Sequence, residues 1–254
     1  MYVADGRFTA QRPSRFDGRI DLAGRFIVPP YGDAHTHGFG DQKTIGSANA
    51  VHLRHGVFYW NALLHSHKAE CDSYFVIDQP DDIARQWRAI MADRPNVVTI
   101  FLLDTENYAS MRADTARLGA TGLDPSPVPA IVAAAHRSGR RVAAHIESAA
   151  DFHVAVAAGV DMVAHLPGFA LTSAVDSVRA VIAPADAQLA AQRGLAVIPT
   201  AWHATQRRIS RGDTARIERT LRVECQDLAT LRRFGVRLAA EGTVSVQRAA
   251  RFER

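Results

Sequence analysis

The sequence has few cysteines, no long apolar run and no block of charge of one sign. Its 254 residues include only Cys71 and Cys225, which lie far apart and outside any Cys-x-x-Cys pattern, so reduced thiols are the simplest expectation. No apolar run approaches the length of a transmembrane helix, and the N-terminus lacks the apolar segment of a secretory leader. These absences predict a cytoplasmic protein with no disulfide framework and no membrane partner.

The charge is also too evenly mixed for a nucleic-acid-binding protein. The formal net charge is only +4, and no long basic run occurs. Arginines cluster weakly between residues 206 and 222, but Glu218 and Glu224 are interleaved with them or follow closely. This pattern is typical of a solvated helix face, so we expect no nucleic-acid partner.

Apolar runs and helical patterns alternate along the whole chain. This alternation predicts a parallel α/β sheet, and the length is typical of one (β/α)8 barrel. Strands are expected near residues 25–32, 56–60, 73–78, 97–103, 141–146, 161–165, 195–200 and 235–240. Helices are expected near residues 45–54, 80–93, 126–138, 149–158, 183–193 and 214–234. With no internal repeat or linker, residues 1–254 are predicted to form a single domain.

Glycines punctuate this alternation where a helix gives way to a strand. Gly139, Gly159, Gly194 and Gly235 each follow a helical pattern and precede an apolar run. Glycine at this point is the usual chemistry of a turn from helix to strand, so these positions support the predicted boundaries.

His35 and His37 form the most informative motif, because an apolar run leads directly into this His-x-His pair. Residues i and i+2 of a strand point to the same side, so two imidazoles leave the strand together and can share one metal ion. Such a chelate is typical of zinc and needs one or two further ligands. His-x-His also arises by chance and in solvated loops, so the motif alone leaves both interpretations open.

His145 and His165 each end a short apolar run, and a helical pattern with a closing Gly159 lies between them. This order predicts strand, helix and strand, with one histidine at the carboxyl end of each strand. Functional groups of parallel α/β folds gather at that end. Either histidine alone fits a hydrogen-bonded residue at the rim of the sheet, whereas all four histidines together favour a metal site.

These motifs resemble those of the amidohydrolase superfamily of metal-dependent (β/α)8 barrels. The resemblance spans roughly residues 18–240, with His-x-His on the first strand and single histidines on the fifth and sixth. It implies that His35, His37, His145 and His165 are metal ligands and that the metal is a divalent ion, with zinc preferred. It further implies hydrolysis of an amide, a cyclic amide or a related C–N bond of a small-molecule substrate by a metal-activated water.

Two positions depart from the superfamily pattern. A lysine that is carbamylated in many members is replaced near the end of the fourth strand by Thr99, which cannot bridge two metals. Thr243 stands where the eighth strand of the family ends in an aspartate that accepts a proton, and Glu241 is the nearest carboxylate. The proton-transfer residue is therefore unassigned. The alternative is a non-catalytic protein: a degenerate barrel of this type that still binds a metal or a ligand at its rim.

The two ends of the chain are short by the standard of this superfamily, which usually adds a small β-sandwich. Residues 1–24 are expected to be a remnant of its N-terminal β segment, and residues 244–254 form an atypical tail. Most of the β-sandwich is then missing, and the short ends leave open whether the barrel is complete. The sequence is also compatible with a homo-oligomer.

The other histidines carry weaker signals. His203 follows the seventh apolar run and is the candidate for contact with substrate. His136 is expected at a helix C-terminus, and His153 inside a helix. The second His-x-His pair, His65 and His67, lacks a strand pattern and is interpreted as a polar loop or a helix start.

Overall fold

The computed structural model describes residues 2–4, 7–26, 31–36, 50, 54, 57–62, 75–92, 94–113, 122–168, 174–200 and 214–239. The chain divides into two compact units, Met1–Pro30 and Tyr31–Arg254. No helix among these residues has both the length and the apolar character needed to cross a membrane.

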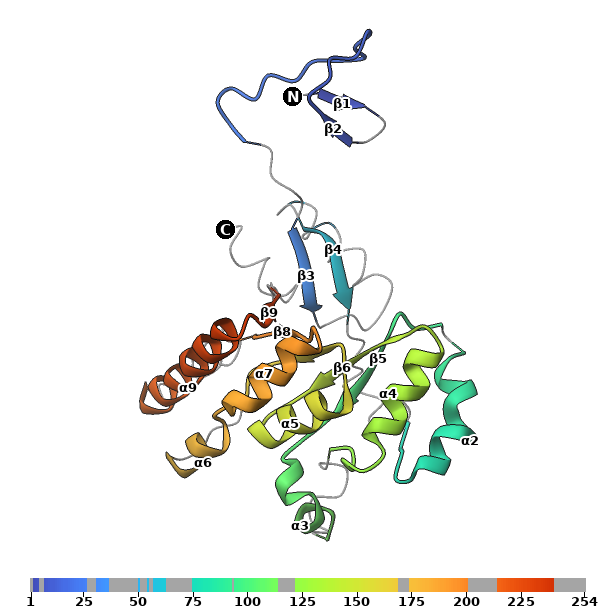
Figure 1. Cartoon of the computed structure of the whole chain (residues 1–254), viewed down its shortest axis with the longest axis vertical. Coiled ribbons are helices and arrows are strands. Elements are labelled where there is room, and N and C mark those ends of the chain that lie inside the picture. Colours follow the sequence, from blue (N-terminus) through green and yellow to red (C-terminus); the bar gives the residue numbers. More distant parts are fainter. Residues whose placement is uncertain are drawn as a thin grey trace. The chain divides into compact units, whose positions relative to one another are not determined.

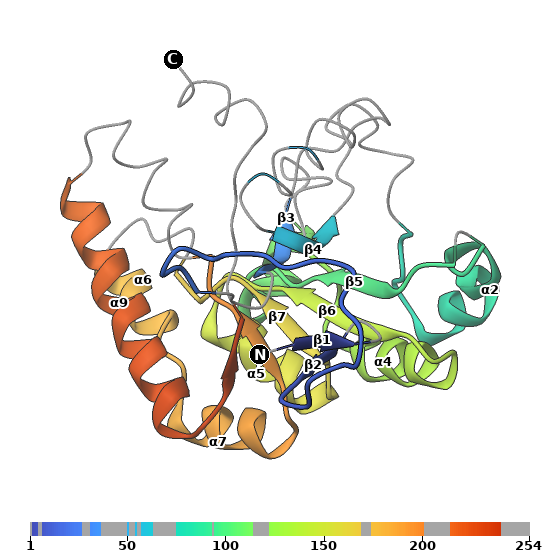
Figure 2. The ribbon, with the colours of Figure 1, turned by 90° about the horizontal axis from the view of Figure 1, so that it is seen from above.

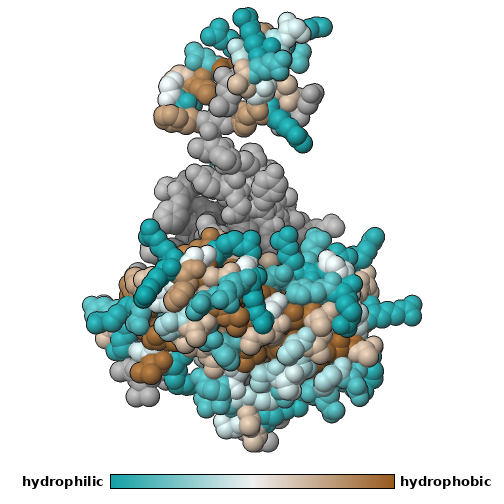
Figure 3. Space-filling model, viewed as in Figure 1, coloured by the Kyte–Doolittle hydropathy of each residue, from teal (hydrophilic) through white to brown (hydrophobic). Residues whose placement is uncertain are grey.

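The first unit is built on a β-hairpin. Strand β1 (Tyr2–Ala4) pairs antiparallel with β2 (Arg7–Thr9). Several large apolar side chains of this unit face solvent, including Phe8 at 59%, Ile20 at 85% and Phe26 at 90% exposure, and Figure 3 shows apolar surface among its residues. The unit therefore buries little apolar surface of its own.

Strands β3 (Tyr31–Thr36) and β4 (Val57–Ala62) form a parallel pair at the start of the second unit (Figure 1). The predicted first strand, residues 25–32, is wrong at Arg25 and Phe26, which lie outside any strand, and residues 27–30 of it fall outside the described residues. The backbone gives the reason at Arg25: its N–H closes a turn through a 2.9 Å hydrogen bond to the carbonyl of Leu22 instead of donating to a sheet.

The main sheet has five parallel strands in the order β5-β6-β7-β8-β9, and each strand pairs with the next along the chain. Its strands are β5 (Val97–Phe101), β6 (Arg141–His145), β7 (Met162–Ala164), β8 (Ala196–Ile198) and β9 (Arg237–Leu238). The predicted parallel α/β fold is thereby confirmed. The expected strand at residues 73–78 is wrong in its described part, because residues 75–78 form no strand and Phe75 and Val76 are exposed.

Helices lie between successive strands and form a layer on one face of the main sheet (Figures 1 and 2). Within this layer α2, α4, α5, α7 and α9 contact one another in chain order. The helices are α2 (Pro80–Ile90), α3 (Tyr108–Ala113), α4 (Val128–Arg137), α5 (Ala149–Ala158), α6 (Ala174–Arg179), α7 (Pro184–Gln192) and α9 (Thr214–Arg233), with a 3-10 turn η1 (Thr105–Asn107).

The hydrophobic core lies between the sheet and this helical layer. Its largest fully buried side chains come from the helices and from the segments that connect helices and strands: Phe152, Leu102, Ile146, Leu166, Ile182, Leu195 and Leu231. Burying an apolar side chain of this size stabilises the fold by about 1.5–3 kcal/mol relative to exposure.

Alternate residues of each strand face opposite sides of the sheet. In β6, Val142 and Ala144 pack into the core beneath the helices, so Ala143 and His145 belong to the opposite face. The helix-to-strand turns use the predicted glycines, for example Gly159 with φ of 83° and Gly194 with φ of 67°, both in the left-handed region that favours glycine.

Candidate active site

His145 and His165 lie at the carboxyl ends of two neighbouring strands. His145 is the last residue of β6, and His165 directly follows β7. Their ring centroids are 4.6 Å apart, with the ring planes at 77° to each other. The prediction that these two histidines meet at one edge of a parallel sheet is therefore confirmed, whereas their role as ligands stays a prediction.

The backbone of His165 explains how its ring reaches His145. In register, His145 pairs with Ala164, so the next residue of an extended strand would face the helical layer. His165 has φ of 79° instead, which breaks this alternation. Its N–H remains tied to the neighbouring strand by a 2.9 Å hydrogen bond to the carbonyl of Ile198.

The His165 ring is held by Thr200, which follows β8. Nδ1 of His165 forms a hydrogen bond with Oγ1 of Thr200, and both residues are only 7% exposed. Thr200 also has a left-handed backbone, with φ of 46°. Left-handed φ costs about 1–3 kcal/mol at a residue other than glycine, and such residues concentrate at functional sites.

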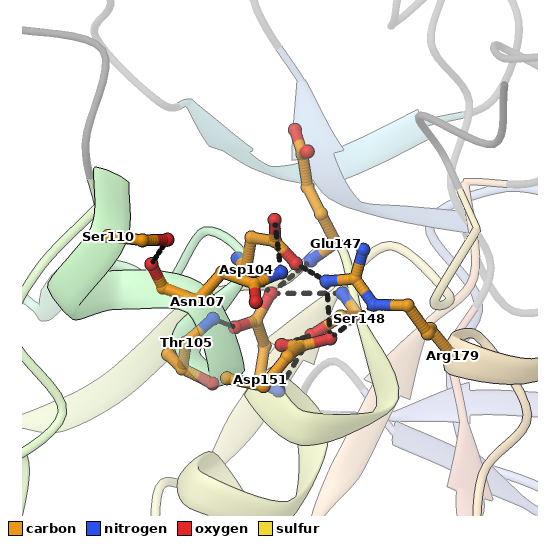
Figure 4. Close-up of polar contacts among 9 residues, drawn as sticks. Asp104, Thr105, Asn107, Ser110, Glu147, Ser148, Asp151 and Arg179 are labelled. Atoms are coloured by element: carbon orange, nitrogen blue, oxygen red, sulfur yellow. Dashed lines mark hydrogen bonds and ion pairs between the residues drawn. The ribbon is translucent and has the colours of Figure 1, made fainter. Parts of the chain in front are cut away.

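His145 has an aromatic neighbour on one side and a carboxylate on another. Phe101 is its register partner on β5, and the two ring centroids are 5.1 Å apart. Nε2 of His145 is 3.6 Å from a carboxylate oxygen of Glu147, which is longer than a direct hydrogen bond. In Figure 4 the Glu147 side chain extends away from Asp151.

Asp151 fixes the loops that follow β5 and β6. This carboxylate is fully buried in the first turn of α5 and accepts four backbone N–H groups (Figure 4). The donors come from the two loops, at distances of 2.9 to 3.1 Å: Asp104, Thr105, Glu147 and Ser148. Ser148 completes a capping box, since its hydroxyl accepts the N–H of Asp151 at 3.1 Å.

Arg179 at the end of α6 bridges to the same loops. Its guanidinium forms an ion pair with Asp104 and donates to Glu106 at 2.6 and 2.9 Å. Glu106 in turn accepts the Ser148 hydroxyl at 2.9 Å. Three loops at the carboxyl edge of the sheet, after β5, β6 and β7, are thus joined by one polar network (Figure 4).

The remaining predicted site residues fall in parts that the structure describes only partly or not at all. His35 lies within β3, where the backbone alone is described. The other predicted positions lie outside the described residues: His37, His203, Glu241 and Thr243, together with His65 and His67. The meeting of all four histidines therefore stays a prediction.

Thr99 lies in the middle of β5 and not near its end, where the sequence analysis placed it. Phe101 ends the strand and occupies the register position beside His145. Neither side chain can form a carbamate, so β5 carries no group that could bridge two metals.

Two other predicted histidines form pairs away from this edge. His136 lies in the last turn of α4, as expected, with Nε2 2.9 Å from Asp161. His153 lies within α5, also as expected, with Nδ1 2.7 Å from Asp186 of α7. Both join neighbouring surface elements.

The donor chemistry of His145 and His165 fits a zinc site in part. Zinc–nitrogen bonds are about 2 Å long, so two rings this close can share one ion. Among the residues that the structure describes, no group of three or more histidine, cysteine or carboxylate side chains could hold a metal. The described pair therefore needs further ligands, and the sequence offers His35 and His37.

The comparisons with known proteins agree with this fold. No family model and no curated protein matches the sequence. Among solved structures, a prolidase in complex with N-methylphosphonate-L-proline is similar, with a TM-score of 0.59 and 14% identity over 92% of this chain and 70% of the other. An amidohydrolase has a TM-score of 0.54 and 16% identity over 91% and 71% of the two chains.

A third similar structure is the ochratoxinase of A. niger, with a TM-score of 0.55 and 13% identity over 85% of this chain and 63% of the other. At such low identity these likenesses establish the fold and not an activity. The resemblance drawn from the histidine motifs is thereby confirmed at the level of the fold: the chain has the fold of amidohydrolase-family proteins.

Proposed function

We propose that the protein is a metal-dependent hydrolase of the amidohydrolase type, built on a (β/α)8 barrel. It cleaves an amide, a cyclic amide or a related C–N bond of a small molecule. The observation that carries this proposal is the 4.6 Å approach of the His145 and His165 rings at the carboxyl ends of adjacent parallel strands. The hydrolase names of the similar structures support the same reaction class.

In this proposal His35, His37, His145 and His165 hold one divalent ion, with zinc preferred, and His203 contacts the substrate. When bound, zinc polarises a carbonyl group and lowers the pKa of water. The protein contributes placement: β6 and β7 hold His145 and His165 side by side, and the network around Asp151 fixes the loop between β6 and α5.

A single metal ion suits the described strands better than a bridged pair. Thr99 and Phe101 both lie on β5, and neither can supply a carbamate. Catalytic zinc sites keep a position open for water or substrate, so an ion held by all four histidines would need a fifth coordination position for hydrolysis.

The alternative function is a barrel that binds a metal or a ligand at its rim without turnover. The observation that favours it is Thr243, which stands where the resemblance implies a proton-accepting aspartate. Threonine cannot accept that proton at neutral pH, so catalysis would need another base.

A hydrolase assay beside metal analysis separates these functions. The purified full chain is assayed on a panel of dipeptides, cyclic amides and N-acyl amino acids, before and after dialysis against a chelator, and after zinc is restored. The proposal expects turnover that the chelator abolishes, zinc restores, and His145→Ala eliminates.

The matched control is His153→Ala, which removes an exposed histidine paired with Asp186 on the helical layer. This variant should keep both zinc and turnover. A stoichiometric divalent metal without turnover on the whole panel would support the alternative, and absence of any divalent metal from the wild-type protein would overturn both functions as metal-based.

A further inference from the structure

We propose that Thr200 is a positioning residue that selects the tautomer of the neutral His165 ring. In this inference the Thr200 hydroxyl accepts a hydrogen bond from Nδ1–H, so that Nε2 carries the lone pair that can bind a metal. The inference rests on the proposed function for its metal, but the tautomer of the ring can be measured in the metal-free protein as well.

The contact between the two residues resembles the hydrogen bonds that orient metal-binding histidines. Nδ1 of His165 is hydrogen-bonded to Oγ1 of Thr200, and both residues are nine-tenths buried or more. The partner of one ring nitrogen decides which nitrogen is protonated, and metal-binding histidines usually donate the other N–H to an oxygen atom.

The backbone supports a specific role for this pair. His165 and Thr200 both have left-handed φ, at 79° and 46°, at the carboxyl ends of adjacent strands β7 and β8. A β-branched residue in this region is a genuine outlier. Glycine would adopt the same backbone without strain, so a turn alone does not require threonine here.

The His165 side of the contact is equally fixed. The N–H of His165 donates to the carbonyl of Ile198, two residues before Thr200. Backbone and side chain of His165 are therefore both bound to the β8 segment, and ring rotation would break the bond to Thr200.

The effect of the hydroxyl is measured with two variants of the full chain. Thr200→Val keeps the branched shape and removes the hydroxyl, whereas Thr200→Ser keeps the hydroxyl. Long-range proton–nitrogen spectra of the 15N-histidine-labelled, metal-free protein above pH 8 identify the protonated nitrogen of His165, which is assigned by comparison with His165→Gln. Competition with a zinc-binding dye gives the zinc affinity.

The proposal expects Nδ1–H in the wild type and in Thr200→Ser, and loss of this form in Thr200→Val. Zinc binding should weaken about 10–100-fold in Thr200→Val and return in Thr200→Ser. The proposal would be overturned if the wild type carried the proton on Nε2, or if the tautomer of His165 were unchanged in Thr200→Val.

Two further outcomes are also decisive. If the wild type binds neither zinc nor another divalent metal, the proposed function fails, while the spectra of the metal-free protein still decide the role of Thr200. If Thr200→Val does not fold, Thr200→Ser is compared with Thr200→Ala, because these two variants differ only in the hydroxyl. The proposal expects Nδ1–H of His165 in Thr200→Ser and its loss in Thr200→Ala.

Discussion

The backbone N–H of Thr105 donates a 2.9 Å hydrogen bond to the carboxylate of Asp151, 46 residues further along the chain. Thr105 lies in the loop after β5, and Asp151 lies in the first turn of the helix after β6. The same carboxylate accepts three more N–H groups and is fully buried. One side chain thus replaces the solvent that these buried loop amides would otherwise need.

We predict that Asp151→Asn lowers the free energy of unfolding by at least about 2 kcal/mol. Asparagine has one acceptor oxygen and presents an NH2 group to donors, so buried N–H groups lose their partners, each at a cost of about 1–3 kcal/mol. Urea denaturation followed by circular dichroism measures the change. Asp186→Asn, which removes a carboxylate paired with exposed His153, is the control and should change stability by less than 1 kcal/mol.

Part of the hydrogen-bond network of Asp151 could be predicted from the sequence. Ser148 and Asp151 are three residues apart before an apolar helical pattern, which is the signature of a capping box. The partners Asp104 and Thr105 of Asp151 lie on a loop more than forty residues away in sequence. No local pattern encodes that distance, so the joining of the loops is visible only in the folded chain.

The order of strands and helices followed from periodicity and glycine positions, because these are local properties of the chain. Residues 141–145 and 149–158 form β6 and α5 almost as predicted. The start of the first strand was misplaced because the N–H of Arg25 bonds back to the carbonyl of Leu22 in a turn, which the apolar residues that follow do not reveal. The run at residues 75–78 failed for another reason: only Ile77 is buried in the core, whereas Phe75 and Val76 face solvent, so the apolar pattern does not mark a strand.

The candidate site, like the fold, could be predicted from the sequence only in part. His145 and His165 were identifiable because each ends an apolar run. Thr200 was not, because its importance depends on a left-handed backbone and on a hydrogen bond to a residue 35 positions earlier. Arg179 was missed as well, since its partners on the β5 loop are separated from it by more than seventy residues.

We predict that Arg179→Met loosens the loops without unfolding the protein. The ion pairs of Arg179 with Asp104 and Glu106 are only half-buried, so their loss should cost less than about 1 kcal/mol of global stability. Hydrogen exchange should nevertheless accelerate at residues 104–107 and 174–180, because local opening responds to local contacts. Arg85→Met is the control, since Arg85 pairs with Asp82 within α2 alone. Equal exchange in wild type and Arg179→Met would contradict this prediction.

We predict that zinc raises the melting temperature of the chelator-treated protein. A ligand present at a hundred times its dissociation constant stabilises the folded state by about 2.7 kcal/mol, which corresponds to roughly 5–10 °C for a chain of this size. The rise should be lost in His145→Ala and in His165→Ala and retained in His136→Ala, whose imidazole pairs with Asp161. A rise of the same size in all three variants would place the zinc elsewhere.

Asp227 introduces a pH dependence that is separate from the candidate site. This carboxylate on α9 is fully buried and accepts the N–H of Ile182 at 2.9 Å, and its second oxygen has no hydrogen-bond partner among the described residues. Burial raises the pKa of Asp227 from 3.8 to about 7, against the smaller opposite effect of the Ile182 N–H. The folded state therefore prefers the protonated form.

The sign of the effect follows from linkage. Because the folded-state pKa lies above the unfolded value, the contribution of Asp227 to stability is fully present below about pH 4 and is lost as the pH rises to about 7. We predict that Asp227→Asn, a neutral mimic, removes this loss. It should match the wild type near pH 4 and exceed its free energy of unfolding by a few kcal/mol at pH 8. Urea denaturation across this range measures the difference, with the exposed Glu218→Gln on the same helix as control. A difference between Asp227→Asn and wild type that stays constant from pH 4 to pH 8 would show that the carboxyl group titrates normally in the folded protein.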